Sequence, residues 1–299
     1  MNPKDARTLH NRGYARSKNG QFDRAIADYD QAINLDPGYA QAFTSRGRSY
    51  LEKRDYDRAL ADLRQAVKLD PKDRLSLVAL AAACDHQGQY DCALNAYDQA
   101  LESNPDDLDS LLGRGSAYVS LEQYDLAMRD FDKVLRLRPN DADAFAARGR
   151  ANALRRRVPE AMADYDQALK IKPDDPVALV NRGLLYIDLR LFDMAIRDYD
   201  RVLRANPREL KALDNRGAAW LSKGNPDRAI EDFNSAIGLD PKDAFALLSR
   251  GMAYVVKGEF DRGMKDIDEA VELKPGDEKM RTVRDRTRAK GRQTFPQKQ

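Results

Sequence analysis

The side chains of this sequence best suited to catalysis or metal binding are two cysteines and two histidines. Cys84, His86 and Cys92 lie within nine residues of one another, and His10 stands alone near the start. Thiolates and imidazoles bind zinc, but three candidate ligands at this spacing match no common zinc motif. We predict that the cysteines are small, buried, reduced thiols, with a disulfide as the alternative. The two histidines are expected to be groove or surface residues.

No other pattern in the sequence supports catalysis. It contains no glycine-rich phosphate loop, no nucleophile motif and no histidine cluster. Aspartate and glutamate are abundant, but they recur at regular spacing, as structural or solvated residues would. We therefore predict a protein that is not an enzyme and that needs no cofactor or metal.

The elements that would position such side chains recur every 34 residues. Proline and glycine both keep this step, at Pro37, Pro71, Pro105, Pro139, Pro173, Pro207, Pro241 and Pro275, and at Gly13, Gly47, Gly115, Gly149, Gly183, Gly217 and Gly251. A fixed period in this range predicts a solenoid of stacked units rather than one globular core. After a lead-in at 1–5 we place eight repeats, numbered by positions 1 to 34, at 6–39, 40–73, 74–107, 108–141, 142–175, 176–209, 210–243 and 244–277.

Each repeat is expected to fold as two helices. In the first repeat the pattern predicts one helix from Ala6 to Asn19, ended near Gly20, and a second from Asp23 to Leu35. Large apolar residues recur at positions 4 and 24, aromatic residues at position 11, and small residues at positions 8 and 20. Small residues let two helices approach closely, so the aromatic stripe is predicted to be core and not a cofactor site.

Glycine at position 8, aromatic residues at 11 and 24, alanine at 20 and 27 and proline at 32 are similar to the tetratricopeptide repeat, over residues 6–277. The resemblance implies an all-α, right-handed superhelical solenoid of eight helix-turn-helix repeats, whose first helices line an inner groove. It also implies a non-enzymatic interaction scaffold or adaptor that binds a partner protein or peptide in this groove. The family's clamp for a C-terminal carboxylate is not assembled here, because position 5 holds no lysine in any repeat.

Two charged positions change together within the one sequence. Arginine occupies position 7 and aspartate position 23 in seven of the eight repeats, and both exceptions, Leu80 and Ala96, fall in the third repeat. We infer an ion pair between the two helices of each repeat, for example between Arg148 and Asp164. Replacing both charges by apolar residues leaves nothing unpaired, which is how a buried pair is lost without penalty. The alternative is two independent surface charges.

Composition sets the broad class. The chain is 42% hydrophobic and 33% charged, as expected of a helical protein with much of its surface in water. No run of about 18 apolar residues is present, so no membrane span is predicted. The start, MNPKDARTLH, lacks the apolar stretch of a secretory signal, so the expected location is cytoplasmic.

Residues 278–299 break the pattern, with Arg281 and Asp285 where an apolar residue and glycine belong. Met280 and Val283 give a narrow apolar face, which predicts a basic capping helix and tail. Eight basic and two acidic side chains give this segment a formal charge of +6. An alternative function follows: a nucleic-acid or anionic-surface binder that acts through the tail. Nucleic acid is the weaker reading, because aromatic residues for base stacking are not interleaved with the charges.

The partner site is predicted on positions 2, 5, 9, 12 and 13 of the first helices, which face the groove in this family. From the sixth repeat onward large apolar residues gather there: Val177, Val180, Leu184, Ile187, Leu221, Phe245, Leu248, Met252, Val255 and Val256. We expect none of them to be needed for packing between helices, so an apolar patch would remain for a contact. The alternatives are a homodimer through this groove, or the chain's own tail with Phe295. The polar first half offers secondary candidates in Arg7, His10, Tyr14 and Arg48.

Overall fold

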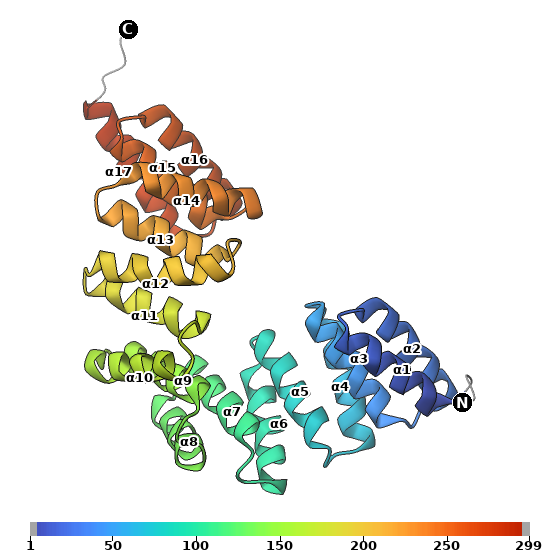
Figure 1. Cartoon of the computed structure of the whole chain (residues 1–299). Helices are drawn as coiled ribbons and strands as arrows, with labels where there is room; N and C mark the ends of the chain where they lie inside the picture. The colour runs from blue at the N-terminus through green and yellow to red at the C-terminus, as the bar shows by residue number, and fades with distance from the viewer. Residues whose placement is uncertain (1–4, 295–299) are drawn as a thin grey trace. The chain divides into compact units, whose positions relative to one another are not determined.

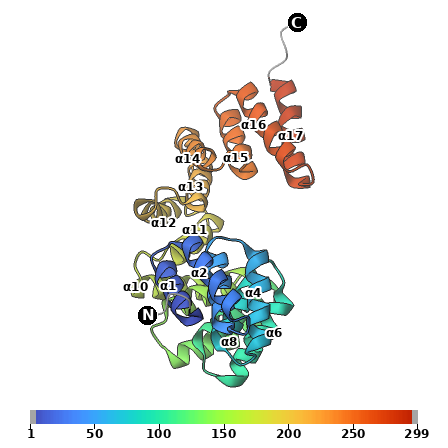
Figure 2. The same ribbon diagram turned by 90° about the vertical axis from the view of Figure 1, so that its right-hand side faces the viewer.

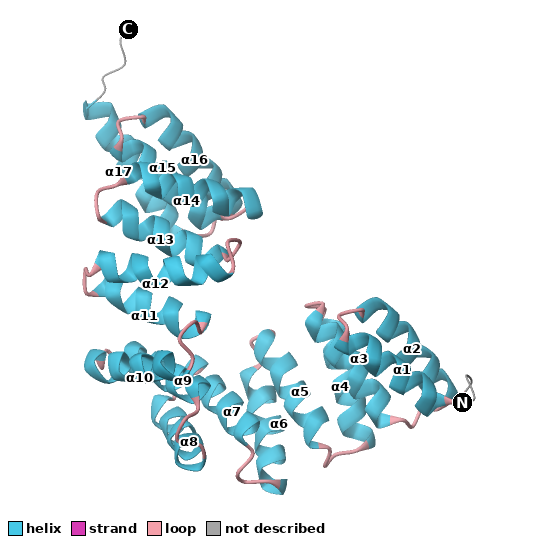
Figure 3. Ribbon diagram, in the orientation of Figure 1, coloured by secondary structure: helices cyan, strands magenta, loops and turns pink. Residues whose placement is uncertain are grey.

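The computed structural model describes residues 5–294, with side chains from 5 to 291, and every element in this range is an α-helix (Figure 3). The chain divides after Arg155 into two compact blocks. The N-terminal block holds α1 (Ala6–Lys18), α2 (Phe22–Leu35), α3 (Ala40–Glu52), α4 (Tyr56–Leu69), α5 (Arg74–His86), α6 (Tyr90–Ser103), α7 (Leu108–Ser120), α8 (Tyr124–Leu137) and α9 (Ala142–Leu154).

The C-terminal block begins at Arg156 and ends in the basic helix (Figure 1). It holds α10 (Val158–Ile171), α11 (Pro176–Asp188), α12 (Phe192–Ala205), α13 (Leu210–Ser222), α14 (Pro226–Leu239), α15 (Ala244–Val256), α16 (Phe260–Leu273) and α17 (Glu278–Thr294). Eight helix pairs followed by a final helix confirm the predicted all-α repeat fold. The handedness of the superhelix stays a prediction. No helix in the described part of the chain is long and apolar enough to cross a membrane.

The final helix packs as a cap. α17 lies against α16 (Figure 1 and Figure 2), and Met280 is buried beside Leu247 and Val271. Arg281 and Asp285, the two residues that break the repeat pattern, are exposed. A polar outer face of this kind is typical of the capping elements of repeat solenoids.

Glycine at position 8 sets the distance between the helices of a pair. A Cβ atom on Gly115 would lie 2.5 Å from the Phe131 ring, and one on Gly183 would lie 2.7 Å from the Tyr199 ring. The aromatic residue at position 24 therefore packs directly on the backbone of the first helix. Both rings are fully buried, which explains why a small residue recurs opposite a large one.

The predicted ion pair within each repeat is confirmed in six repeats. Arg114 shows the geometry: its Nε and Nη2 donate to the two carboxylate oxygens of Asp130 at 2.8 and 2.7 Å. Equivalent pairs join Arg12 to Asp28, Arg46 to Asp62, Arg182 to Asp198, Arg216 to Asp232 and Arg250 to Asp266. Arg148 belongs to the N-terminal block and Asp164 to the C-terminal block, so that pair stays a prediction.

The same guanidinium also reaches the preceding repeat. Nη1 of Arg114 donates to Asp98, at position 25 of the third repeat, at 2.7 Å. The equivalent bond joins Arg46 to Asp30, Arg148 to Asp132, Arg182 to Asp166 and Arg216 to Asp200, and Arg250 bonds the amide oxygen of Asn234. We call this arrangement the arginine clamp. It ties the two helices of one repeat together and ties that repeat to its predecessor.

The third repeat lacks the whole clamp. Leu80 and Ala96 are buried in an apolar cluster at the clamp positions. Position 25 of the second repeat, where the clamp would need an acceptor, holds Arg64, which instead donates to Gln89. All three members of the clamp have therefore changed together, so no buried charge is left without a partner.

A disulfide joins the two helices of the same repeat, so the prediction of reduced thiols is wrong. Cys84 on α5 and Cys92 on α6 are bonded, with their Cα atoms 5.8 Å apart. They occupy positions 11 and 19, which face each other across the pair. In the second, seventh and eighth repeats an aromatic ring at position 11 meets an arginine at position 19, as with Arg58 over Tyr50 at 4.5 Å. The cytoplasmic location stays a prediction.

Prediction for the clamp. Arg114→Leu should lower the free energy of unfolding by about 3 kcal/mol, because it leaves the buried Asp130 carboxylate unpaired. Arg114→Leu with Asp130→Ala, which copies the third repeat, should be less destabilised than the single variant. Urea titration followed by circular dichroism gives the coupling energy. The exposed Arg136→Leu is the control and should change stability by no more than about 0.5 kcal/mol. A double variant that loses as much as the sum of its parts would contradict the clamp.

Prediction for the disulfide. Reducing the Cys84–Cys92 bond should lower the melting temperature, because the cross-link restricts the unfolded chain by about 2–3 kcal/mol for a loop of this length. Melting curves with and without a phosphine reductant measure the shift. Cys84→Ala with Cys92→Ala should melt like the reduced protein and should ignore the reductant. Equal melting temperatures of the oxidised and reduced wild-type protein would refute the expectation.

Candidate partner-binding surface

The first helices of the C-terminal block form a continuous face. α11, α13 and α15 each contact the next, so their positions 2, 5, 9, 12 and 13 lie along one side, which we call the first-helix face. Four of the predicted site residues are exposed on it, namely Val177 (58%), Leu184 (42%), Phe245 (43%) and Val256 (60%). The four lie on α11 and α15, with α13 between them. Exposed apolar side chains of this size on one face are typical of a contact surface.

The remaining predicted residues are partly buried, and four of them do pack the core. Val180 and Ile187 pack against a cluster that contains Tyr186 and Tyr199. Leu221 packs beside Trp220, and Leu248 packs against the cluster of Leu247 and Met280. The expectation that none of these positions is needed for packing is therefore wrong for these four. Positions 5 and 12 lie at the edge between repeats, so their side chains are shared between the face and the core.

The first-helix face also contains an aspartate that was not among the predicted site residues. Asp214, at position 5 of α13, is only 8% exposed, and its Oδ1 has no hydrogen-bond partner among the described residues. Burial raises the pKa of Asp214 to about 7, and its hydrogen bond and repulsion with Asp243 act in the same direction. Asp243 is itself occupied as the N-cap of α15, where its Oδ1 accepts from the backbone of Phe245 and Ala246. Position 5 is apolar in the sixth and eighth repeats. An aspartate at this position in the seventh repeat is the sequence feature that could have identified Asp214 as unusual.

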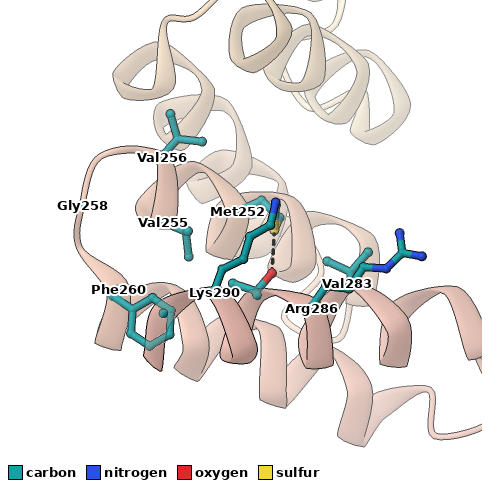
Figure 4. Close-up of a pocket in the computed structure, with 10 residues that line it drawn as sticks. Met252, Val255, Val256, Gly258, Phe260, Val283, Arg286 and Lys290 are labelled. Atoms are coloured by element: carbon teal, nitrogen blue, oxygen red, sulfur yellow. Dashed lines mark hydrogen bonds between the residues drawn. The ribbon is translucent and has the colours of Figure 1, made fainter. Parts of the chain in front are cut away.

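A pocket lies at the C-terminal end of the first-helix face. It has a volume of about 560 Å³ and lies between α15, the start of α16 and α17 (Figure 4). Three of the predicted site residues, Met252, Val255 and Val256, form its α15 wall. The other walls hold Phe260 from α16, and Val283, Arg286, Thr287, Lys290 and Gly291 from α17. We call this the cap pocket.

The secondary candidates lie in the N-terminal block and are differently placed. The His10 ring is within hydrogen-bond distance of Ser45 Oγ (2.9 Å) and Tyr39 Oη (3.3 Å), and burial lowers the pKa of His10. His10 is thus a packing residue with both ring nitrogens engaged. Tyr14 is 49% exposed with the Lys18 ammonium 5.4 Å from its ring, and Arg7 and Arg48 are exposed. His86 is exposed and stacks on Tyr56.

Nothing in this arrangement indicates a metal centre. Within residues 5–291, no three histidine, cysteine or acidic side chains are placed to hold an ion together. The chemistry that the first-helix face offers is burial of apolar side chains, with charge at its C-terminal end.

Comparison with known proteins agrees with this architecture. A family profile described as Tetratricopeptide repeat matches residues 10–74, 44–107, 85–130, 112–176, 180–244 and 221–278. No curated protein matches the sequence. Solved structures with a similar fold include the Cut9–Hcn1 hetero-tetramer of the APC/C, with a TM-score of 0.70 and 15% identity over 89% of this chain and 52% of the other. This chain thus spans about half the length of that one.

Two further structures resemble the chain. Yeast Tom70 has a TM-score of 0.70 and 17% identity over 100% of this chain and 66% of its own. YrrB, a TPR protein with an unusual peptide-binding site, has a TM-score of 0.51 and 27% identity over 60% of this chain and 93% of its own.

Prediction for Asp214. Its folded pKa of about 7 lies above the unfolded value of 3.8, so the contribution of Asp214 to stability should fall as the pH rises from about 4 to 8. Asp214→Asn removes this dependence and should be more stable than the wild type at pH 8, by at most about 4 kcal/mol. Urea midpoints at pH 4.5, 6 and 8 measure the difference. The exposed Asp188→Asn serves as control, and a constant difference between wild type and Asp214→Asn across this range would exclude a raised pKa.

Proposed function

We propose, from the premise that this chain belongs to the tetratricopeptide repeat family, that it is a non-enzymatic scaffold that binds a partner protein or peptide on the first-helix face. Proteins of this family hold protein partners, and the first helices line the inner groove of their solenoid. Cut9 is found in a hetero-tetramer with Hcn1, and YrrB has a peptide-binding site. These relatives support the class of activity for this chain.

The observation that carries the proposal is the exposed apolar row on the C-terminal block. Leu184, Phe245 and Val256 come from two first helices, and each has more than two fifths of its surface in water. Burying such side chains against a partner is favourable by about 25 cal/mol per Å². A face built from side-by-side helices suits an amphipathic helix or an extended apolar segment.

The alternative function, binding of nucleic acid or an anionic surface through the basic tail, gains no support from the contacts of α17. Arg284 pairs with Asp285, and both carboxylate oxygens of Asp268 bind Arg288. These two cations are used within the chain. The tail beyond Thr294, with Phe295, lies outside the described residues.

Prediction for the first-helix face. Leu184→Glu with Phe245→Glu should weaken binding of peptides selected on the wild-type chain from a random 12-residue display library by more than about tenfold. The reason is that two buried apolar contacts would be replaced by charges. Fluorescence anisotropy measures the binding, and circular dichroism should show unchanged helicity.

The matched control places the same charges elsewhere. Leu191→Glu with Leu273→Glu changes two exposed leucines that are not on the first-helix face. This variant should bind like the wild type. Peptides that bind all three proteins equally would rule out the first-helix face. Sedimentation of the three proteins separately tests the homodimer, which only the Leu184/Phe245 variant should disrupt.

A further inference from the structure

The cap pocket combines an apolar floor with a basic rim. Met252, Val255 and Phe260 come from the last repeat, and Val283 faces them from α17 (Figure 4). Thr287 Oγ1 lies 3.6 Å from Met252 Sδ and closes the base of the pocket. The volume of about 560 Å³ falls within the range of about 300–1,000 Å³ that is usual for ligand pockets.

The rim is basic because α17 continues the spacing of the first helices. Counted from Glu278, Arg286 stands at position 9 and Lys290 at position 13, the positions that line the first-helix face in the repeats. Both side chains border the cap pocket, and that of Lys290 extends from α17 toward Met252 (Figure 4). The apolar row of α11, α13 and α15 therefore ends against two cations.

Asp268, Asp285 and Glu259 are paired with cations other than Arg286. Asp268 and Asp285 are bound by Arg288 and Arg284, and Glu259 is bound by Lys257 and Arg262. Within residues 5–291, no carboxylate forms an ion pair with Arg286. Arg286 thus presents positive charge beside an apolar cavity, which favours a ligand with negative charge next to an apolar group.

We propose that the cap pocket binds a partner segment in which a large apolar side chain stands beside aspartate or glutamate side chains. The apolar side chain fills the space between Met252, Phe260 and Val283, and the acidic side chains meet Arg286 and Lys290. This proposal rests on the proposed function and adds to it the chemistry of the partner. It brings the apolar face and the basic helix into one site.

The chain's own end is a poorer match for this chemistry. Residues 295–299, Phe-Pro-Gln-Lys-Gln, include an aromatic residue but no aspartate or glutamate, and they add a further lysine. Charge complementarity therefore favours an acidic partner.

The first experiment selects peptides from the random 12-residue library in parallel on the full-length wild type and on Arg286→Glu with Lys290→Glu. Wild-type selections should be enriched in aspartate or glutamate within about two residues of a large apolar side chain. The charge-reversed protein should lose this enrichment. Arg281→Glu with Arg284→Glu carries the same change of charge on the same helix outside the pocket, and its selections should match the wild type.

The second experiment measures affinity of the most enriched peptide by fluorescence anisotropy. Arg286→Glu with Lys290→Glu should weaken it at least tenfold, and Arg286→Gln with Lys290→Gln should weaken it several-fold with less disturbance of α17. The wild-type affinity should fall as salt rises from 50 to 300 mM, and that of the glutamine variant should fall less. A peptide with its acidic residues changed to lysine should bind the charge-reversed protein better than the wild type.

Failure of this proposal can be told apart from failure of the proposed function. Selected peptides without acidic enrichment, unaffected by the Arg286/Lys290 variants but lost in Leu184→Glu with Phe245→Glu, would overturn the cap pocket and leave the first-helix face intact. A library that yields no binder would overturn both. A gain in affinity after deletion of residues 295–299 would assign the pocket to the chain's own tail. A dimer lost only in the charge-reversed protein would assign it to a second copy.

Discussion

One guanidinium shared between two carboxylates holds most of this structure in register. The arginine at position 7 binds the position 23 carboxylate of its own repeat with two donors and the position 25 carboxylate of the preceding repeat with a third. The position 23 carboxylate is buried, with Asp130 only 5% exposed, so it is tolerable only while the arginine is in place. The planar fork of arginine suits this role, and lysine could not make the same three bonds. Pairing within a repeat and stacking between repeats thus depend on the same side chain.

The third repeat shows what happens when this constraint is removed. Leu80 and Ala96 lie in the core and Arg64 bonds Gln89, so positions 7 and 23 of this repeat carry no charge that needs a partner. The two helices are joined instead by the Cys84–Cys92 disulfide, one helical turn beyond Leu80. The covalent bond occupies the positions at which other repeats stack an arginine on an aromatic ring. In the third repeat an apolar contact and a disulfide therefore stand where other repeats have an arginine–aspartate ion pair and an arginine stacked on an aromatic ring.

The features of this structure that the sequence predicts are those that can be found by comparing the eight repeats with one another. The fold follows from the period, and the pair between positions 7 and 23 follows from Leu80 and Ala96 changing together. The link to position 25 was missed because its partner lies in the next repeat, so Arg64 has to be compared with Leu80 across the boundary. The disulfide was only the alternative prediction, because the angle between the two helices decides whether positions 11 and 19 face each other. The partial burial of Val180 and Leu221 depends on contacts with the neighbouring repeat. The spacing of residues within one repeat carries no information about these contacts.

The packing of α17 on the last repeat also explains why basic side chains lie beside the apolar residues of the first-helix face. α17 keeps small or apolar residues at the positions that pack on the last repeat, including Met280, Thr287 and Gly291, all of which are buried. A Cβ atom on Gly291 would lie 1.9 Å from the Phe260 ring, so only glycine there lets α17 approach α16 this closely. Several of its other positions, such as Arg281, Asp285 and Arg286, are exposed and charged. Because α17 still follows the spacing of a first helix, some of these charged positions lie on the first-helix face. α17 thus has small or apolar side chains on the side that packs against the last repeat and charged side chains on its exposed side. This arrangement places cations beside the apolar residues of α15.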